Sequence, residues 1–168
     1  MNSFIRFLRG FSYAAHGIGS CIKRERNMRV HLCAVALVLY FCLFFRPSRI
    51  EFAILMLCFG LVIGAEAANT AVESLADRLH PDIHPAIRLA KDAAAGAVLI
   101  AAIASVLVGL CLFVWTDRFL PALHSMMTIP AGWIGLLCLM LLSVVVVFVI
   151  PIPQNEMKQE NRGTNGTE

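Results

Sequence analysis

Charged residues are scarce in this sequence. They form 15% of the 168 residues, whereas a soluble domain carries about a quarter. Hydrophobic residues form 59% of the chain, and the mean hydropathy is +0.77. This balance argues against an ordinary soluble enzyme and predicts an integral membrane protein that lipid mostly surrounds. At this length we expect one compact unit.

Several familiar sequence signatures are also missing. The six cysteines form neither a CxxC pair nor a Cys/His cluster, so we expect no disulfide framework or zinc site. Gly17-Ile18-Gly19 is followed by no GK[ST], which favours a bend or a close-packing site over a phosphate-binding loop. Arg6 and Arg9 interrupt the first apolar residues, so we predict no cleavable signal peptide. The net charge of +3 is modest, and we expect no nucleic-acid partner.

The apolar residues follow helical patterns. Residues 2–26 place apolar side chains on one stripe and most basic side chains off it, which predicts an amphipathic helix in the membrane surface. Packing of that helix on other helices is the alternative. Four segments that could span a membrane follow, at 30–45, 50–77, 90–115 and 132–150. The predicted fold class is therefore all-α, a surface helix joined to a transmembrane bundle.

Prolines and polar residues separate these segments. Pro81 and Pro85 predict a loop over 78–88, and Pro151 and Pro153 end the last span. The same prolines argue against a helical metal-binding pair of His80 and His84. The polar tail, 154–168, is expected to be disordered.

The basic residues predict the orientation in the membrane. Eleven of them fall on the side that holds both termini and the 78–91 region, and three fall on the other side. Because cytoplasmic loops carry an excess of Lys and Arg, we place both termini and the end of the third segment in the cytoplasm, where ATP is found.

Four polar residues near the cytoplasmic end of the third segment carry the strongest chemical signal. On a helix, Asn69 lies about 60° from Glu66, and Glu73 and Asp77 each lie about 20° from it, so all four share one face. Inserting a carboxylate within a membrane span costs about 2.5–3.5 kcal/mol, so a functional role would explain why this stripe is present. Hydrogen bonding between helices and an interfacial helix end are the structural alternatives.

Paired carboxylates at a membrane boundary suit Mg²⁺, which binds one or two carboxylates together with substrate phosphates. Phosphoryl transfer needs positioning, charge neutralisation and a group that accepts the hydroxyl proton. Lys91 and Asp92 begin the next span close by, and Lys91 could contact a phosphate. Glu25, in a basic stretch before the second segment, is a candidate second metal ligand.

Two motifs here resemble the bacterial diacylglycerol kinase and undecaprenol kinase family of small integral-membrane lipid kinases. They are EAANTAVE at 66–73, followed by Asp77, and AKDAAAGAV at 90–98; ERNMRVH at 25–31 also matches, and 4–17 does so more loosely. The resemblance covers about residues 3–115. The ERNM…H form, which includes His31, resembles the undecaprenol kinases more than the diacylglycerol kinases.

The resemblance implies a homotrimer of three-span subunits, with active sites between subunits that use ATP and Mg²⁺ on a membrane lipid alcohol. It implies Glu66 as general base, Glu25 and Glu73 as metal ligands, and Asn69 as an orienting group. Its implied nucleotide-binding residues are Glu25, Glu73, Asp77, Lys91, Asp92, Arg6, Arg9 and Gly17. The expected location is the bacterial inner membrane, with the active site on the cytoplasmic side.

We therefore expect a kinase domain at 1–118, an additional span at 119–153 and a tail at 154–168. The predicted function is transfer of the ATP γ-phosphoryl group to undecaprenol in preference to diacylglycerol. A transporter or ion pathway that uses the intramembrane carboxylates is the alternative, although the carboxylates cluster at one end and no inverted repeat is evident. A non-catalytic scaffold would leave the acidic stripe unexplained.

Overall fold

The structure is a computed structural model that describes residues 3–79 and 84–151, and within these ranges it contains helices and no strand. The elements are α1 (Ser3–Arg24), α2 (Arg26–Phe45), α3 (Arg49–Leu79), α4 (Pro85–Phe113), α5 (Phe119–Thr128), α6 (Pro130–Val144) and the π-helical turn η1 (Val145–Val149). Four helical stretches are long and apolar enough to cross a membrane: α2, α3, α4, and α6 continued by η1. The predicted all-α membrane fold is confirmed.

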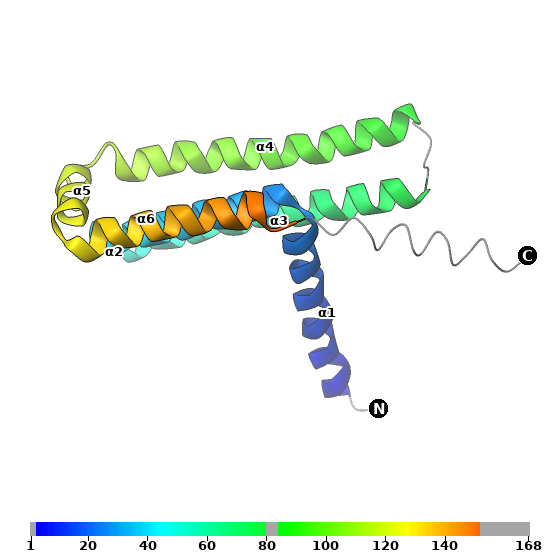
Figure 1. Ribbon diagram of the computed structural model, residues 1–168. Helices are drawn as coiled ribbons and strands as arrows, with labels where there is room; N and C mark the ends of the chain where they lie inside the picture. The colour runs from blue at the N-terminus through cyan, green and yellow to red at the C-terminus, as the bar shows by residue number, and fades with distance from the viewer. Residues whose placement is uncertain (1–2, 80–83, 152–168) are drawn as a thin grey trace, which may run out of the picture.

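The spans lie side by side, and α1 leaves them at a steep angle (Figure 1). α3 packs along α4, α2 contacts α3, and α6 lies along α2. α5 lies at one end of the bundle and connects α4 to α6 (Figure 1). An amphipathic helix directed across the spans has the orientation that a helix in the membrane surface requires.

α3 is longer than a membrane span needs to be. Its 31 residues extend for about 46 Å, against a hydrocarbon core of about 30 Å. The C-terminal end of α3 and the N-terminal end of α4 continue past the level at which α1 leaves the bundle (Figure 1). α3 can therefore cross the membrane and still carry its last polar turns beyond the hydrocarbon.

The structure corrects three predicted boundaries. α2 begins at Arg26 rather than at residue 30, and α4 begins at Pro85 rather than at residue 90, so the predicted loop at 78–88 is too long. Proline is well suited to the first turn of a helix, where no N–H partner is needed. His84 caps that turn, because its Nδ1 accepts a hydrogen bond of 3.3 Å from the amide of Ala86. His80 and the tail at 154–168 lie outside the described residues.

The additional segment at 119–153 also differs from the prediction of a single span. Its first part forms α5, with Pro121 in the first helical turn, where proline is tolerated. The span itself begins at Pro130, two residues before the predicted start, and ends in η1. α1 continues through Gly17 and Gly19, and a Cβ at either position would meet open space. Neither glycine is therefore a close-packing site within the chain.

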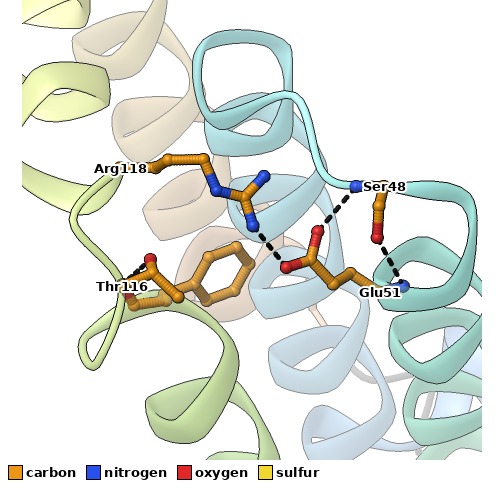
Figure 2. Close-up of polar contacts among 5 residues, drawn as sticks. Ser48, Glu51, Thr116 and Arg118 are labelled. Atoms are coloured by element: carbon orange, nitrogen blue, oxygen red, sulfur yellow. Dashed lines mark hydrogen bonds and ion pairs between the residues drawn. The ribbon is translucent and has the colours of Figure 1, made fainter.

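A network of polar contacts closes the end of the bundle that is distant from α1 (Figure 2). The Ser48 amide donates to Glu51 Oε2 over 2.6 Å, and the Glu51 amide donates to Ser48 Oγ over 3.3 Å. This reciprocal pair is a capping box that fixes the start of α3. Glu51 Oε1 also pairs with Arg118, whose guanidinium lies over the Phe45 ring. The starts of α3 and α5 are thereby joined to the end of α2.

Close contacts join the additional span to the rest of the molecule. Tyr40 on α2 donates its hydroxyl to the carbonyls of Ala131 and Gly132, at 3.0 and 2.8 Å. A Cβ added at Gly132 would lie 2.2 Å from the backbone oxygen of Met126, and one added at Gly135 would lie 2.3 Å from Tyr40 Oη. Both glycines therefore permit approaches that a larger residue would prevent.

We predict that Gly132→Ala destabilises the protein by about 1–3 kcal/mol, because backbone must move to admit the methyl group. Gly135→Ala should destabilise it less, since the end of the Tyr40 side chain can rotate away. Thermal unfolding of the purified protein in detergent measures both effects. Gly10→Ala, where a Cβ meets open space, is the control and should not lower the midpoint. Equal midpoints for all three variants would contradict the predicted contact.

Candidate functional site

One face of α3 changes along its length from apolar to acidic. Leu55 and Val62 are buried on this face, and Glu66 and Asn69 follow at helical spacing and are buried as well. The next residues of the stripe, Glu73 and Asp77, lie in the more exposed last turns. The face therefore joins a hydrocarbon-like surface to a carboxylate-rich surface within one helix.

Glu66 is the most deeply buried residue of the stripe. Its side chain is 1% exposed, and neither carboxylate oxygen has a hydrogen-bond partner among the described residues. The backbone around it is well held, because Thr70 Oγ1 donates to the Glu66 carbonyl over 2.9 Å. A buried and unpaired carboxylate is costly, and it is ready to accept a proton or a donor from a bound molecule.

Asn69 links Glu66 to the outer part of the stripe. Its Nδ2 donates to Glu73 Oε1 over 3.0 Å, which orients the carboxylate one turn later. Its Oδ1 is buried without a hydrogen-bond partner among the described residues. Two successive residues of the stripe thus present acceptors that the described part of the chain does not satisfy.

The end of α3 and the start of α4 meet through an ion pair. Lys91 Nζ lies 2.7 Å from Asp77 Oδ1, so the predicted approach of Lys91 to the acidic stripe is present in the fold. Asp92 forms a different pair, 3.9 Å from Arg88 Nε, and both side chains are largely exposed. The structure therefore brings Lys91, but not Asp92, into contact with the stripe.

Glu25 completes the acidic cluster within the same chain. It occupies the N-cap of α2, in the break that follows α1, and is half-buried. Loss of hydration raises the pKa of this carboxyl, and the negative charges of Glu73, Glu66 and Asp77 raise it further. Because those charges act on Glu25, the carboxylates from α2 and α3 share one region and repel one another.

The remaining predicted residues lie on α1. Arg6, Arg9 and Gly17 are exposed on this helix, which points away from the bundle (Figure 1). The predicted residues that the fold gathers at one end of the bundle are Glu25, Glu66, Asn69, Glu73, Asp77 and Lys91.

An apolar groove of about 560 Å³ lies between α2, α3 and α4. Its α3 wall includes Leu55, Phe59 and Val62, and Glu66 follows Val62 by one turn on the same face. His31 contributes to the wall from α2, and Phe119 and Leu123 of α5 contribute at the other end. The groove therefore leads along the membrane-spanning part of α3 toward the acidic stripe.

Sequence reasoning missed one buried charge beside this cluster. Arg29 is 3% exposed and donates to backbone carbonyls of α1 and of the additional span. Arg29 lies one residue before the predicted span at 30–45, so the sequence pattern indicates only a basic flank. The start of α2 at Arg26 places this cation within the helix, where charged residues face protein rather than lipid.

The described residues contain no group of three or more His, Cys, Asp or Glu side chains that is arranged to hold a metal ion alone. Mg²⁺ does not need such a group, because it retains waters and shares its coordination with substrate phosphates. Burial raises the pKa of Glu25, and repulsion from Glu73, Glu66 and Asp77 raises it further; a bound cation would relieve that repulsion. The donor set fits a magnesium ion that arrives with a nucleotide.

Comparisons with known proteins identify relatives of this chain. The sequence profile of the prokaryotic diacylglycerol kinase family matches residues 12–113. The chain is 38% identical to the undecaprenol kinase of Bacillus subtilis over 112 residues, which cover 67% of this chain and 91% of that protein. It is 39% identical to the diacylglycerol kinase of Synechocystis over 118 residues, which cover 70% and 64%. No solved structure gives a significant match.

The chain belongs to the prokaryotic diacylglycerol kinase family. It is a lipid kinase, and this decides against the transporter alternative. The matched region contains Glu25, the acidic stripe of α3 and Lys91. α5, α6 and η1 lie outside it.

We predict opposite effects when two carboxylates of α3 are neutralised. Glu66→Gln should stabilise the fold by about 1–3 kcal/mol, because it removes a buried charge that has no partner. Glu51→Gln should destabilise it by about 1 kcal/mol, because Arg118 loses its ion pair. Thermal unfolding in the same detergent compares the two variants. A lower midpoint for Glu66→Gln would mean that its carboxylate is satisfied in the folded protein.

Proposed function

We propose that this kinase transfers the γ-phosphoryl group of ATP to the hydroxyl of a membrane lipid alcohol, and acts on undecaprenol in preference to diacylglycerol. The observation that carries the proposal is the face of α3 on which an apolar wall leads into Glu66 and then into the acidic stripe. A lipid alcohol has the same division, because a hydrocarbon tail ends in a hydroxyl that must meet a charged nucleotide at the membrane boundary.

Glu66 is the general base in this proposal. The apolar groove holds the hydrocarbon tail, so the lipid hydroxyl is presented one turn beyond Val62, beside the unpaired carboxylate. Glu66 takes the hydroxyl proton as the lipid oxygen bonds to the γ-phosphorus. The bond from that phosphorus to the β–γ bridging oxygen breaks, and ADP leaves.

In this proposal the acidic stripe and Lys91 bind the phosphates of the nucleotide. Glu25 and Glu73 would hold Mg²⁺, which would neutralise phosphate charge when bound with the nucleotide. Asn69 keeps Glu73 in place through its 3.0 Å hydrogen bond. Asp77 holds Lys91 at the gap between α3 and α4, so its ammonium group can reach a phosphate.

The proposal also includes the outer members of the predicted nucleotide site, Asp92, Arg6, Arg9 and Gly17. Because α1 points away from its own bundle (Figure 1), Arg6 and Arg9 would serve the site of a neighbouring subunit. This direction of α1 is compatible with the homotrimer that the family resemblance implies, in which sites are completed between subunits. The preference for undecaprenol is supported by the ERNM…H motif, whose His31 lines the groove, and by the similarity to the Bacillus undecaprenol kinase.

We place the site on the cytoplasmic side of a bacterial inner membrane. The end of α3, which carries the stripe, and the start of α4, which carries Lys91, lie at the end of the bundle where α1 meets α2 (Figure 1). Glu25 lies in the break between α1 and α2. The excess of basic residues on this side supports the orientation.

The decisive experiment supplies the purified full chain in lipid bilayers with labelled ATP, Mg²⁺ and either undecaprenol or diacylglycerol. We expect labelled lipid with both alcohols and faster labelling of undecaprenol. Glu66→Gln should lower the rate by about 10²–10⁴-fold, as expected on loss of a general base. Glu51→Gln, at the other end of the same helix, is the matched control and should keep the parent rate.

Equal rates for Glu66→Gln and the parent would show that the base is assigned incorrectly. Faster labelling of diacylglycerol would contradict the preferred substrate and leave the kinase reaction in place.

The kinase activity should depend on pH through the Glu25 carboxyl. The pKa of Glu25 is raised by burial and by Glu73, Glu66 and Asp77, so this carboxyl holds its proton up to a higher pH than an ordinary glutamic acid. Metal binding needs the deprotonated form, so at limiting Mg²⁺ the activity should fall as the pH falls through this pKa. Additional Mg²⁺ should move this acidic fall in activity to lower pH, because metal and proton compete for one carboxylate.

Rates measured across pH at several Mg²⁺ concentrations test this competition. Glu25→Gln, which has no proton to lose, should remove the Mg²⁺-dependent shift. If the pH at which the activity of the parent falls is the same at every Mg²⁺ concentration, Glu25 has no role as a metal ligand.

A further inference from the structure

Arg29 lies in the first turns of α2 and is almost completely buried. A cation within a membrane-spanning helix is costly unless its donors are satisfied by protein. Four backbone carbonyls accept from this guanidinium, and they belong to two different helical ends. Arg29 is therefore a connection between elements that are distant in the sequence.

The first pair of acceptors belongs to the end of α1. Nε donates to the Ile22 carbonyl over 2.8 Å, and Nη2 donates to the Lys23 carbonyl. The second pair belongs to the C-terminal end of η1, because Nη1 donates to the carbonyls of Val146, in η1, and of its C-cap residue Ile150, at 3.3 and 2.7 Å. The last carbonyls of a helix have no partner in the helix and carry partial negative charge. One guanidinium thus caps two helix C-termini at once.

A second contact joins the same two elements. The guanidinium of Arg26, at the start of α2, lies over the ring of Phe148 at 4.3 Å from its centroid. η1 and α6 lie outside the family match at 12–113. The Bacillus relative is covered over 91% of its length by 112 aligned residues, so it is too short for an equivalent of 119–149. The second pair of acceptors for Arg29 therefore has no equivalent in that relative.

The corner that Arg29 holds contains Glu25. Ile22 and Lys23 precede Glu25 by three and two residues, and Arg29 follows it by one helical turn. The Glu25 amide donates to the Cys21 carbonyl over 2.8 Å, so its backbone is part of the same corner. Fixing this corner fixes the direction from which the Glu25 carboxylate meets the stripe of α3.

We propose that Arg29 is a positioning residue that locks the corner between α1 and α2 to the additional span, and that the additional span thereby holds Glu25 in place for nucleotide binding. The inference rests on the metal role proposed above for Glu25. It gives the additional span a part in the kinase reaction although this span contributes no group to the acidic cluster.

The test compares kinetic constants of full-length variants. Arg29→Gln should raise the KM for MgATP about tenfold or more, as loss of a group that orients a metal ligand does. The KM for the lipid alcohol should change less, because Glu66 and most of the groove wall lie on other helices. Arg29→Lys keeps the charge but cannot bridge both pairs of carbonyls, so it should resemble Arg29→Gln. Full rescue by lysine, or an equal rise in both constants, would overturn the proposal.

A double variant tests whether Arg29 acts through Glu25. Once Glu25→Gln has removed the ligand, adding Arg29→Gln should produce no further rise in the KM for MgATP, because the two changes affect one function. Multiplying effects would overturn the proposal.

Substitutions within the additional span test its role in nucleotide binding. Phe148→Leu removes the ring below Arg26 and should raise the KM for MgATP, whereas Phe148→Tyr keeps a ring and should preserve the parent value. Identical constants for both variants would overturn the role of the additional span.

Hydrogen exchange provides a readout that is independent of activity. Arg29→Gln should speed the exchange of the amides of 22–26 and of 146–150 together, because one side chain caps both ends. Faster exchange at only one of the two segments would overturn the connection. If Glu25→Gln leaves the Mg²⁺ requirement unchanged, the metal role of Glu25 is wrong, and joint loss of protection would still support the connection between the two ends.

Discussion

The cost of burying the Glu66 carboxylate in a membrane-spanning helix is the constraint on which the rest of the structure depends. Neither oxygen has a partner among the described residues, although Thr70 and Asn69 secure the surrounding turns. A helix that only spanned the membrane would be more stable with an apolar residue at this position. The proposed reaction accounts for this position, because a hydroxyl from the lipid phase would meet a phosphate from water at this boundary. The apolar face before Glu66 and the acidic face after it would then serve those two reactants.

The rest of the bundle has a small buried core, and its ion pairs lie near the ends of the helices. At the end opposite α1, the capping box of Ser48 and Glu51 pairs with Arg118 (Figure 2). At the other end, Asp77 pairs with Lys91. Between these ends the outer faces are apolar and exposed, as in Leu57 and Ile100, and lipid replaces the water that would oppose such exposure. The ends of the helices therefore determine the relative positions of the spans, and the site lies where two of those ends meet.

Much of this arrangement could be predicted from the sequence, since helical periodicity places Glu66, Asn69, Glu73 and Asp77 on one face whatever the tertiary structure. The approach of Lys91 also followed, because a short connection between α3 and α4 leaves few alternatives. The start of α4 was predicted wrongly because proline was read as a helix breaker, whereas Pro85 begins the helix. α5 was missed for the same reason. The partner of Asp92 could not be predicted, because an i, i+4 pair with Arg88 competes with the stripe, and only tertiary geometry decides between them.

The burial of Arg29 shows why a span outside the family match matters to the site. Ile22 and Lys23 satisfy only part of its guanidinium, and the carbonyls of Val146 and Ile150 accept from the remaining nitrogen. Without η1, that nitrogen would face lipid or draw water into the corner beside Glu25. A charge that requires two helix ends to be satisfied favours one relative position of those ends, because any displacement leaves a buried donor unpaired. The additional span therefore restricts the motion of the corner that carries Glu25, which is the property that a carboxylate must have to bind a metal in a defined geometry.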